Sequence, residues 1–210
     1  MVSIKNYCCA NTVIVYDDNV RKHISAQLFR GTRHSWYDII KKNKGAEIYK
    51  GGKMDIQFRL GTVDDAGMIV GLINELAEYE KLPDTITTTE EDIRTAIANR
   101  DIETLFASSE GKDVGFAMFL DNYASIFGAK GMFIENLYVR PEYRGNGIGE
   151  AMMRELCRIA VSRGYKKVEW HCLEWNEPAN QLYLKLNATQ KNDWIFYRLF
   201  GEILEELGKR

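Results

Sequence analysis

The chain has 210 residues, of which 45% are hydrophobic, and a formal net charge of -2. This length predicts one domain, or one domain with an appendage. An uncharged apolar run of about 18 residues is absent, so the sequence predicts no membrane-spanning helix. The four cysteines show no CxxC spacing, which favours neither a metal site nor a disulfide framework. We therefore expect a protein of the reducing cytoplasm.

The first 53 residues differ from the rest in charge. They hold ten Lys and Arg against four Asp and Glu, whereas residues 54–210 hold 18 against 26. An acidic main part repels nucleic acid and attracts cations. The codons of "KGGKM" can contain a bacterial ribosome-binding sequence ahead of a start codon, so we hypothesise that Met54 is the true start. The alternatives for residues 1–53 are a disordered tail or a basic extension that docks on the domain.

From Met54 onward the apolar pattern becomes regular. The residues of "DIQFRLG" alternate like a half-buried strand, and Thr62 with Asp65 then has the spacing of a capping box in front of an apolar-faced helix. The segment "TTTEEDIRTAIANR" predicts a second helix, with Thr88 and Glu91 at capping spacing.

The next segments predict a sheet with helices between its strands. "TLFASS" and "VGFAMFL" form a hairpin at "EGKD", and "GMFIENLYV" is a third central strand. A helix from about 148 to 163 follows. "KKVEWHCLE" and "IFYRLF" then predict strands, while "PANQLYLKL" and "GEILEELGKR" predict helices. The order indicates an α/β fold of one domain, a mixed sheet covered by helices, over residues 54–210.

Three glycines, Gly145, Gly147 and Gly149, stand where the strand "IENLYV" gives way to a helix. A helix N-terminus presents free backbone N–H groups and the positive end of the dipole, and glycines let a bulky diphosphate approach them. Arg144 adds a positive charge. The pattern is neither a Walker loop nor G-x-G-x-x-G, because Glu150 takes the place of the last glycine. From the glycines alone, a flexible turn is an equal alternative.

The run from Arg144 to Gly149 resembles the R-x-x-G-x-G/A signature of the GNAT superfamily of acetyl-CoA-dependent N-acetyltransferases. The blocks "ELAEYE", "VGFAMF", "EWNEPANQLY" and "YRLF" extend the resemblance from about residue 56 to residue 204. Together they are similar to the spermidine/spermine (diamine) and thialysine acetyltransferases. The resemblance implies the GNAT fold, with a mostly antiparallel central sheet flanked by helices, acetyl-CoA as cosubstrate, no metal, and a homodimer.

The resemblance also implies a cofactor site. Backbone N–H groups from Arg144 to Gly149 would hold the pyrophosphate of coenzyme A, and the main chain from Leu137 to Val139 would pair with the pantetheine arm. Cofactor-binding residues are thus expected to be Leu137, Tyr138, Val139, Arg144, Gly145, Asn146, Gly147, Ile148, Gly149 and Asn176.

Two residues are expected to be catalytic. Tyr183 would protonate the leaving thiolate, although a tyrosine among leucines is also typical of a core. Glu135 shares the predicted strand face of Phe133, Leu137 and Val139, where a carboxylate needs a partner or a shifted pKa. It would help to remove a proton from an alkylamine of pKa about 10.4. The alternative is a Glu that faces solvent.

The amine would be bound by Tyr79, Glu80, Glu135, Asn136 and Tyr197. Asn136 stands where polyamine enzymes of this type have Asp, and Tyr197 where a channel tryptophan is expected, with Trp194 three residues earlier. These departures favour a smaller amine, a diamine or an amino-acid side chain such as thialysine. His171 and Cys172 are interpreted as structural residues on opposite faces of a central strand.

Two other functions remain open from the sequence. One is a non-catalytic acyl-CoA-binding sensor that uses the same loop. The other is a nucleic-acid binder that uses residues 1–53. We expect the enzyme, with a small amine as its partner and neither nucleic acid nor membrane.

Overall fold

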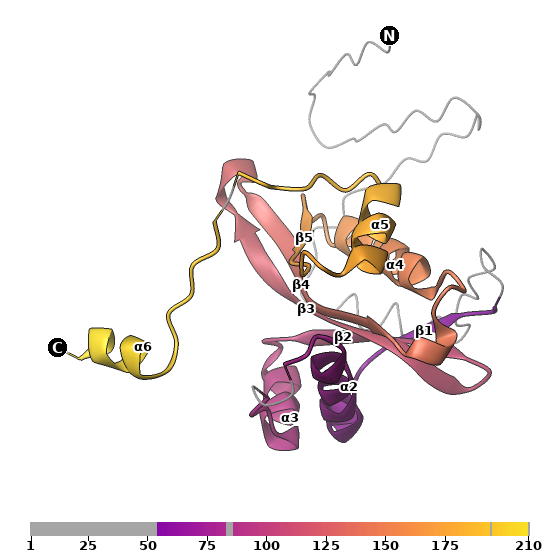
Figure 1. Ribbon diagram of the computed structural model, residues 1–210, viewed down its shortest axis with the longest axis horizontal. Helices are drawn as coiled ribbons and strands as arrows, with labels where there is room; N and C mark the ends of the chain where they lie inside the picture. Colours follow the sequence, from indigo (N-terminus) through magenta and orange to yellow (C-terminus); the bar gives the residue numbers. More distant parts are fainter. Residues whose placement is uncertain (1–53, 83–85, 194, 210) are drawn as a thin grey trace, which may run out of the picture. The chain divides into compact units, whose positions relative to one another are not determined.

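The computed structural model describes residues 54–82, 86–193 and 195–209, so the predictions for residues 1–53 lie outside the described residues. Figure 1 shows the arrangement of the helices and strands. The strands are β1 (Gln57–Leu60), β2 (Glu103–Ser109), β3 (Lys112–Ala124), β4 (Ala129–Val139) and β5 (Val168–Trp170). The α-helices are α2 (Ala66–Tyr79), α3 (Glu90–Asn99), α4 (Ile148–Ser162), α5 (Glu177–Lys185) and α6 (Gly201–Gly208), and the 3-10 turns are η1 (Val63–Asp65), η3 (Ser125–Phe127) and η4 (Pro141–Tyr143).

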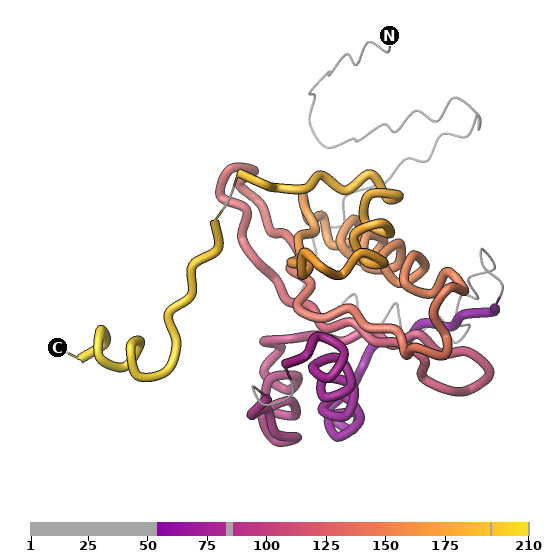
Figure 2. The backbone as a smooth tube through the Cα atoms, in the orientation of Figure 1, coloured from indigo at the N-terminus to yellow at the C-terminus, as the bar shows by residue number. Residues whose placement is uncertain are grey.

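The five strands form one sheet in the order β1-β2-β3-β4-β5. Pairing is antiparallel from β1 to β4 and parallel between β4 and β5. The predicted mixed, mostly antiparallel sheet is therefore confirmed. The hairpin between β2 and β3 turns at Glu110 and Gly111, whose φ angles of 51° and 76° are those of a tight two-residue turn. β3 and β4 form a long hairpin, whose path is clear in Figure 2.

Helices cover both faces of the sheet, with α2 and α3 on one side and α4 and α5 on the other (Figure 1). The alternation along β2 explains the two cores: Leu105 and Ala107 pack in the cluster of α4, while Phe106 packs in the cluster of α2. None of the helices in the described part of the chain combines the length and the apolar character needed to cross a membrane.

The helix start signals of the sequence agree with the structure to within one residue at α4 and at the two capping boxes. The capping box of Thr62 and Asp65 is confirmed, and α4 starts at the glycine segment as predicted. The second capping box lies one residue later than predicted. Thr89, and not Thr88, is the N-cap of α3, and its hydroxyl accepts a hydrogen bond from the Asp92 backbone N–H at 3.2 Å. Three consecutive threonines offer several registers, and only the helix geometry selects one.

Two predicted strands differ from the structure. β5 ends at Trp170, so His171 and Cys172 lie beyond the strand, and the prediction that they point to opposite faces of a central strand is wrong. Residues 195–200, predicted as a strand, have no strand assignment and are all exposed. Apolar and aromatic residues give this segment a high strand propensity, but a strand forms only where a neighbouring edge pairs with it.

β4 contains a β-bulge at Glu135. Met118 pairs with Asn136 and Phe119 pairs with Ile134, so the register passes over Glu135. The extra residue reverses the alternation, which is why Ile134 and Leu137 pack against the same core cluster. The prediction that Glu135 lies on an apolar stripe is therefore wrong, and its side chain is exposed.

Candidate active site

The glycine segment forms a tight corner between β4 and α4. Gly145 and Gly147 have φ angles of 76° and 83°, in the left-handed region that favours glycine, and Gly147 is the N-cap of α4. A Cβ built on Gly145 would meet no atom within 4 Å, so open space adjoins the backbone there. The N-terminus of this 15-residue helix thus has the backbone donors and the clearance that a diphosphate needs.

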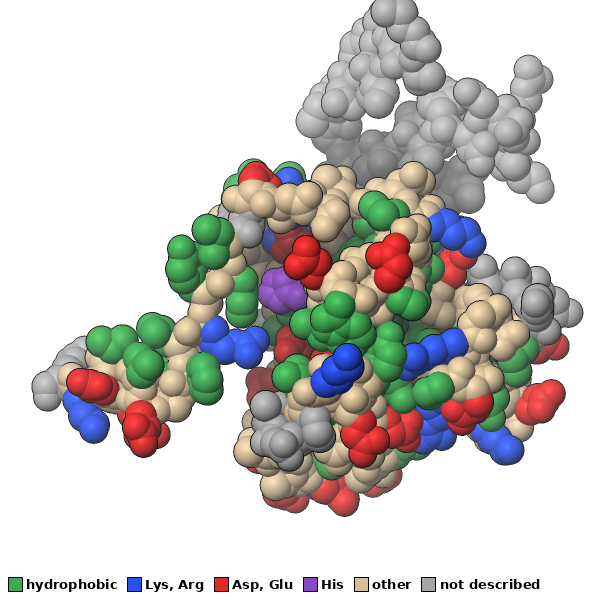
Figure 3. Space-filling model, in the orientation of Figure 1, with side chains coloured by type: hydrophobic (Ala, Val, Ile, Leu, Met, Phe, Trp, Pro, Cys, Tyr) green, Lys and Arg blue, Asp and Glu red, His purple; other side chains and the backbone are tan. Residues whose placement is uncertain are grey.

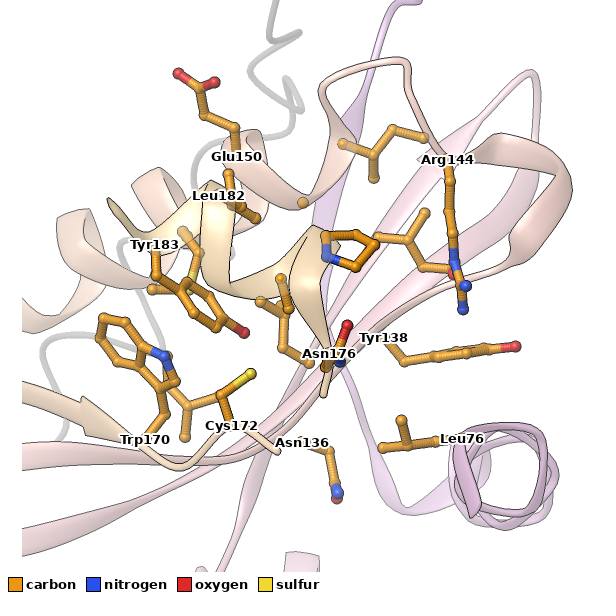
Figure 4. Close-up of a pocket in the computed structure, with 18 of the residues that line it drawn as sticks. Leu76, Asn136, Tyr138, Arg144, Glu150, Trp170, Cys172, Asn176, Leu182 and Tyr183 are labelled. Atoms are coloured by element: carbon orange, nitrogen blue, oxygen red, sulfur yellow. The ribbon is translucent and has the colours of Figure 1, made fainter. Parts of the chain in front are cut away.

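A cavity of about 540 Å³ starts at this corner and continues between β4, β5 and α5. It brings together residues from both ends of the domain sequence, as Figure 4 shows for ten labelled side chains. The predicted site residues that line it are Tyr79, Glu80, Glu135, Asn136, Leu137, Tyr138, Val139, Arg144, Gly145, Gly147, Ile148, Gly149, Asn176 and Tyr183.

Asn146 and Tyr197 are placed differently. The Asn146 side-chain amide donates hydrogen bonds to the Tyr143 carbonyl at 3.0 Å and to the Arg144 carbonyl at 3.3 Å. This side chain therefore stabilises the conformation of the corner. Tyr197 is 83% exposed and lies in the segment that follows α5, apart from the cavity-lining residues. The structure of this chain alone gives Tyr197 no place in an amine channel.

Tyr183 lines the cavity and lies on the opposite side of the view in Figure 4 from Arg144. It projects from α5, and its ring contacts the Trp170 ring of β5, with centroids 4.9 Å apart. Figure 4 shows the Tyr183 hydroxyl and the Cys172 thiol turned toward the same space. Burial raises the pKa of the Tyr183 hydroxyl, with further increases from Cys172 and from the negative charge of Glu80. The phenol therefore keeps its proton at neutral pH.

Glu80 and Cys172 also line the cavity. Burial raises the pKa of the Glu80 carboxyl, and burial followed by the charge of Glu80 raises the pKa of the Cys172 thiol. The thiol is therefore held in its protonated, weakly nucleophilic form. Glu135 supplies a second carboxylate to the cavity from the bulge of β4. The cavity also contains Glu150, but Glu150 is paired with Lys185, so Glu80 and Glu135 are the carboxylates that suit a cationic ligand.

Several cavity residues had no functional assignment from the sequence. His171 and Cys172, interpreted as structural, both line the cavity, and so does Trp170. Lys185 of α5 lies at the glycine end, where its ammonium is 2.7 Å from a Glu150 carboxylate oxygen at the start of α4. Lys185 is separated from the glycines by α4, β5 and the rest of α5 in the sequence, so no spacing pattern connects it with them. Its place beside the glycine corner results from the packing of α5 on α4.

The cavity is not lined by a metal-type donor set. Within residues 54–82, 86–193 and 195–209, no group of three or more His, Cys, Asp or Glu side chains is placed to hold a metal ion. The donors at the corner are backbone N–H groups, Arg144 and Lys185, which are the groups that bind phosphate oxygens.

Comparison with known proteins gives the class. Residues 69–188 match the Acetyltransferase (GNAT) family, and the chain belongs to it. Acetyltransferases of this family use acetyl-CoA as the acyl donor, and this chain is an N-acetyltransferase.

Two relatives agree with this class, and one solved structure shares the fold. Thialysine N-epsilon-acetyltransferase of Bos taurus is 33% identical over 165 residues, which are 72% of this chain and 96% of the relative. L-ornithine N5-acetyltransferase of Arabidopsis thaliana is 33% identical over 95 residues, 45% of this chain and 42% of the relative. An integron cassette protein from Vibrio cholerae superposes with a TM-score of 0.62 over 74% of this chain and 98% of its own, at 22% identity, which shows the shared fold.

Proposed function

We propose that the protein transfers the acetyl group of acetyl-CoA directly to a primary amine of a small diamine, a polyamine or an amino-acid side chain of the thialysine type. The observation that supports this most is the single cavity that joins the glycine corner to Tyr183, Glu80 and Glu135. One end suits a diphosphate and the other suits an ammonium. The relatives named for thialysine and ornithine also act on a flexible side chain that ends in a primary amine.

The corner residues would fix the donor. Backbone N–H groups at Gly145 to Gly149, with Arg144 and Lys185, would hold the diphosphate, and the main chain of Leu137 to Val139 would align the pantetheine arm. The acetyl thioester would then lie at the bulge of β4, close to the carboxylates. This alignment converts the transfer into a reaction between two groups held in one cavity.

The transfer forms a C–N bond to the amine nitrogen and breaks the C–S bond of the thioester. The amine must first lose a proton, which costs about 4.6 kcal/mol at pH 7 for a pKa of about 10.4. Glu135, exposed at the mouth of the cavity, would accept that proton through water. The electron pair of the broken bond remains on sulfur, and the Tyr183 hydroxyl would donate a hydrogen bond and then its proton to this thiolate. The nitrogen, positively charged after its attack, would lose its second proton through water to the Tyr183 oxygen, which leaves a neutral amide, free coenzyme A thiol and a protonated Tyr183. Trp170 would keep the Tyr183 ring in place.

The negative charges indicate a substrate with few ammonium groups. Glu80 and Glu135 are two carboxylates, and Asn136 is neutral where the polyamine enzymes that this chain resembles have Asp. We therefore favour a diamine or an amino-acid side chain over spermidine.

A panel of amines with thiol release as the readout tests this function. Putrescine, spermidine, thialysine, lysine, ornithine and an aminoglycoside would each be added to acetyl-CoA and the protein. We expect release with thialysine, ornithine or putrescine to exceed that with spermidine at least tenfold in kcat/KM. Binding of coenzyme A without acceleration by any amine would instead identify a non-catalytic acyl-CoA sensor.

We also propose that the protein is a cytoplasmic homodimer. Support for the homodimer comes from the C-terminal segment, where Figure 3 shows apolar side chains gathered on the surface. Clusters of exposed apolar residues of this kind are typical of protein interfaces. Eight large apolar side chains are each at least 53% exposed there: Ile195, Phe196, Tyr197, Leu199, Phe200, Ile203, Leu204 and Leu207.

The oligomeric state can be measured by light scattering coupled to size exclusion. The wild-type protein is expected to have the mass of two chains, and a Phe200→Asp, Leu204→Asp variant the mass of one. A wild-type monomer, or a variant that stays dimeric, contradicts this interface.

A further inference from the structure

Tyr79 is the residue at which three parts of the cavity wall meet. It is the last residue of α2, and its hydroxyl donates a hydrogen bond of 3.0 Å to the Asn176 side-chain oxygen, 97 positions away in sequence. Its ring contacts the Trp175 ring, with centroids 5.8 Å apart, and the guanidinium carbon of Arg144 lies 4.1 Å from its centroid. We call Tyr79, Arg144, Trp175 and Asn176 the Tyr79 cluster.

The cluster uses groups that belong to the proposed cofactor site. Arg144 extends over the Tyr138 ring (Figure 4) and over the Tyr79 ring. Its Nε donates a hydrogen bond to the Val139 carbonyl at 2.8 Å. Val139 is one of the residues whose main chain would pair with the pantetheine arm. Asn176 is the N-cap of α5, yet its side chain makes no capping hydrogen bond to described residues and bonds to Tyr79 across the cavity.

Coenzyme A would compete with these internal contacts. Its diphosphate would attract the Arg144 guanidinium, and its pantetheine amides would pair with the Val139 carbonyl and the Asn176 side-chain amide. Each of these groups has a partner within the protein. If a ligand binds only to molecules in which these contacts are already broken, its apparent affinity is the intrinsic affinity multiplied by the fraction of such molecules. The smaller this fraction, the weaker the observed binding.

We propose that Tyr79 is a positioning residue that restrains the cofactor-binding part of the cavity. It holds Asn176 by a hydrogen bond and Arg144 by its ring. Coenzyme A binds by replacing both of these contacts. This inference rests on the proposed function, because it assumes that the cavity binds coenzyme A. It assigns Tyr79 an effect on cofactor binding, whereas the resemblance to polyamine acetyltransferases implied only a role in the amine channel.

The Tyr79→Phe variant isolates the hydrogen bond, because the ring that supports Arg144 is retained. Tyr165→Phe is the matched control: the Tyr165 hydroxyl also donates to a side-chain oxygen, that of Asp121, but Tyr165 lies apart from the cavity-lining residues. Binding of coenzyme A to the full-length protein would be measured by calorimetry, and association by stopped-flow tryptophan fluorescence. Trp175, which is 49% exposed and beside Tyr79, is a reporter within the cluster.

We expect Tyr79→Phe to bind coenzyme A between about two- and tenfold more tightly than the wild type, because the ligand no longer has to replace the hydrogen bond to Asn176. This range corresponds to the net free energy of one intramolecular hydrogen bond. The association rate should rise, and Tyr165→Phe should match the wild type. A residue that only maintains the fold would give weaker binding when altered. Unchanged or weaker binding by Tyr79→Phe, in a protein whose wild type binds coenzyme A, overturns this inference alone. A wild type that fails to bind coenzyme A overturns the proposed function as well.

Discussion

A methyl group at Gly145 is the sharpest perturbation of the proposed diphosphate site. Alanine at a φ of 76° costs about 1–2 kcal/mol of folding free energy, which lowers the Tm of a domain of this size by roughly 2–8 °C. The methyl would also stand in the open space beside the corner, since the built Cβ meets no atom within 4 Å. If it displaces one backbone hydrogen bond to a charged phosphate, about 1.5–3 kcal/mol is lost, which is roughly 10- to 150-fold in affinity.

Gly111 provides a control with the same backbone strain. Its φ is also 76°, and its built Cβ likewise meets no atom within 4 Å, but it lies in the hairpin turn between β2 and β3. Gly145→Ala and Gly111→Ala should therefore lower the Tm by similar amounts in thermal unfolding. Calorimetry with coenzyme A should show weaker binding only for Gly145→Ala. Wild-type affinity in Gly145→Ala, or equal loss in both variants, would refute the assignment of the corner.

Three further predictions concern the other end of the cavity. Tyr183→Phe should lower turnover by about 100-fold or more in the thiol-release assay while the affinity for coenzyme A stays the same, and wild-type turnover would remove Tyr183 from the mechanism. Glu135→Gln should move the acidic limb of the kcat/KM profile to higher pH, because the free amine must then form without a carboxylate; an unmoved profile contradicts that role. Burial and then Glu80 raise the pKa of the Cys172 thiol, so its alkylation by iodoacetamide at pH 8 should be slower than that of free cysteine. Glu80→Gln should lower this pKa and speed the alkylation at the same pH, and an equal or slower rate would show that Glu80 does not act on the thiol.

The parts of the site that depend on local sequence were predictable. The corner from Arg144 to Gly149 needs small residues and a helix start. Both can be recognised in the sequence from the spacing of the glycines and the apolar pattern that follows them. The order of strands and helices from β1 to α5 follows from alternation and capping, which are local properties. Tyr183 was expected from its sequence block, and the structure brings it into the same cavity as the corner.

The remaining features depend on packing between distant segments. The bulge at Glu135 results from the register between β3 and β4, so strict alternation along β4 assigned this residue to the wrong face. The hydrogen bond between Tyr79 and Asn176 joins residues 97 positions apart, and the ion pair of Lys185 with Glu150 depends on how α5 lies on α4. The segment 195–200 has the composition of a strand, but pairing depends on an edge that composition does not specify.

A crystal structure of the protein with coenzyme A tests the central claim most directly. We predict that the diphosphate oxygens accept hydrogen bonds from the backbone N–H groups between Gly145 and Gly149, and that the thiol end lies near Tyr183. Arg144 should have left the Val139 carbonyl, to which it donates at 2.8 Å here. A diphosphate found elsewhere on the protein would contradict the account.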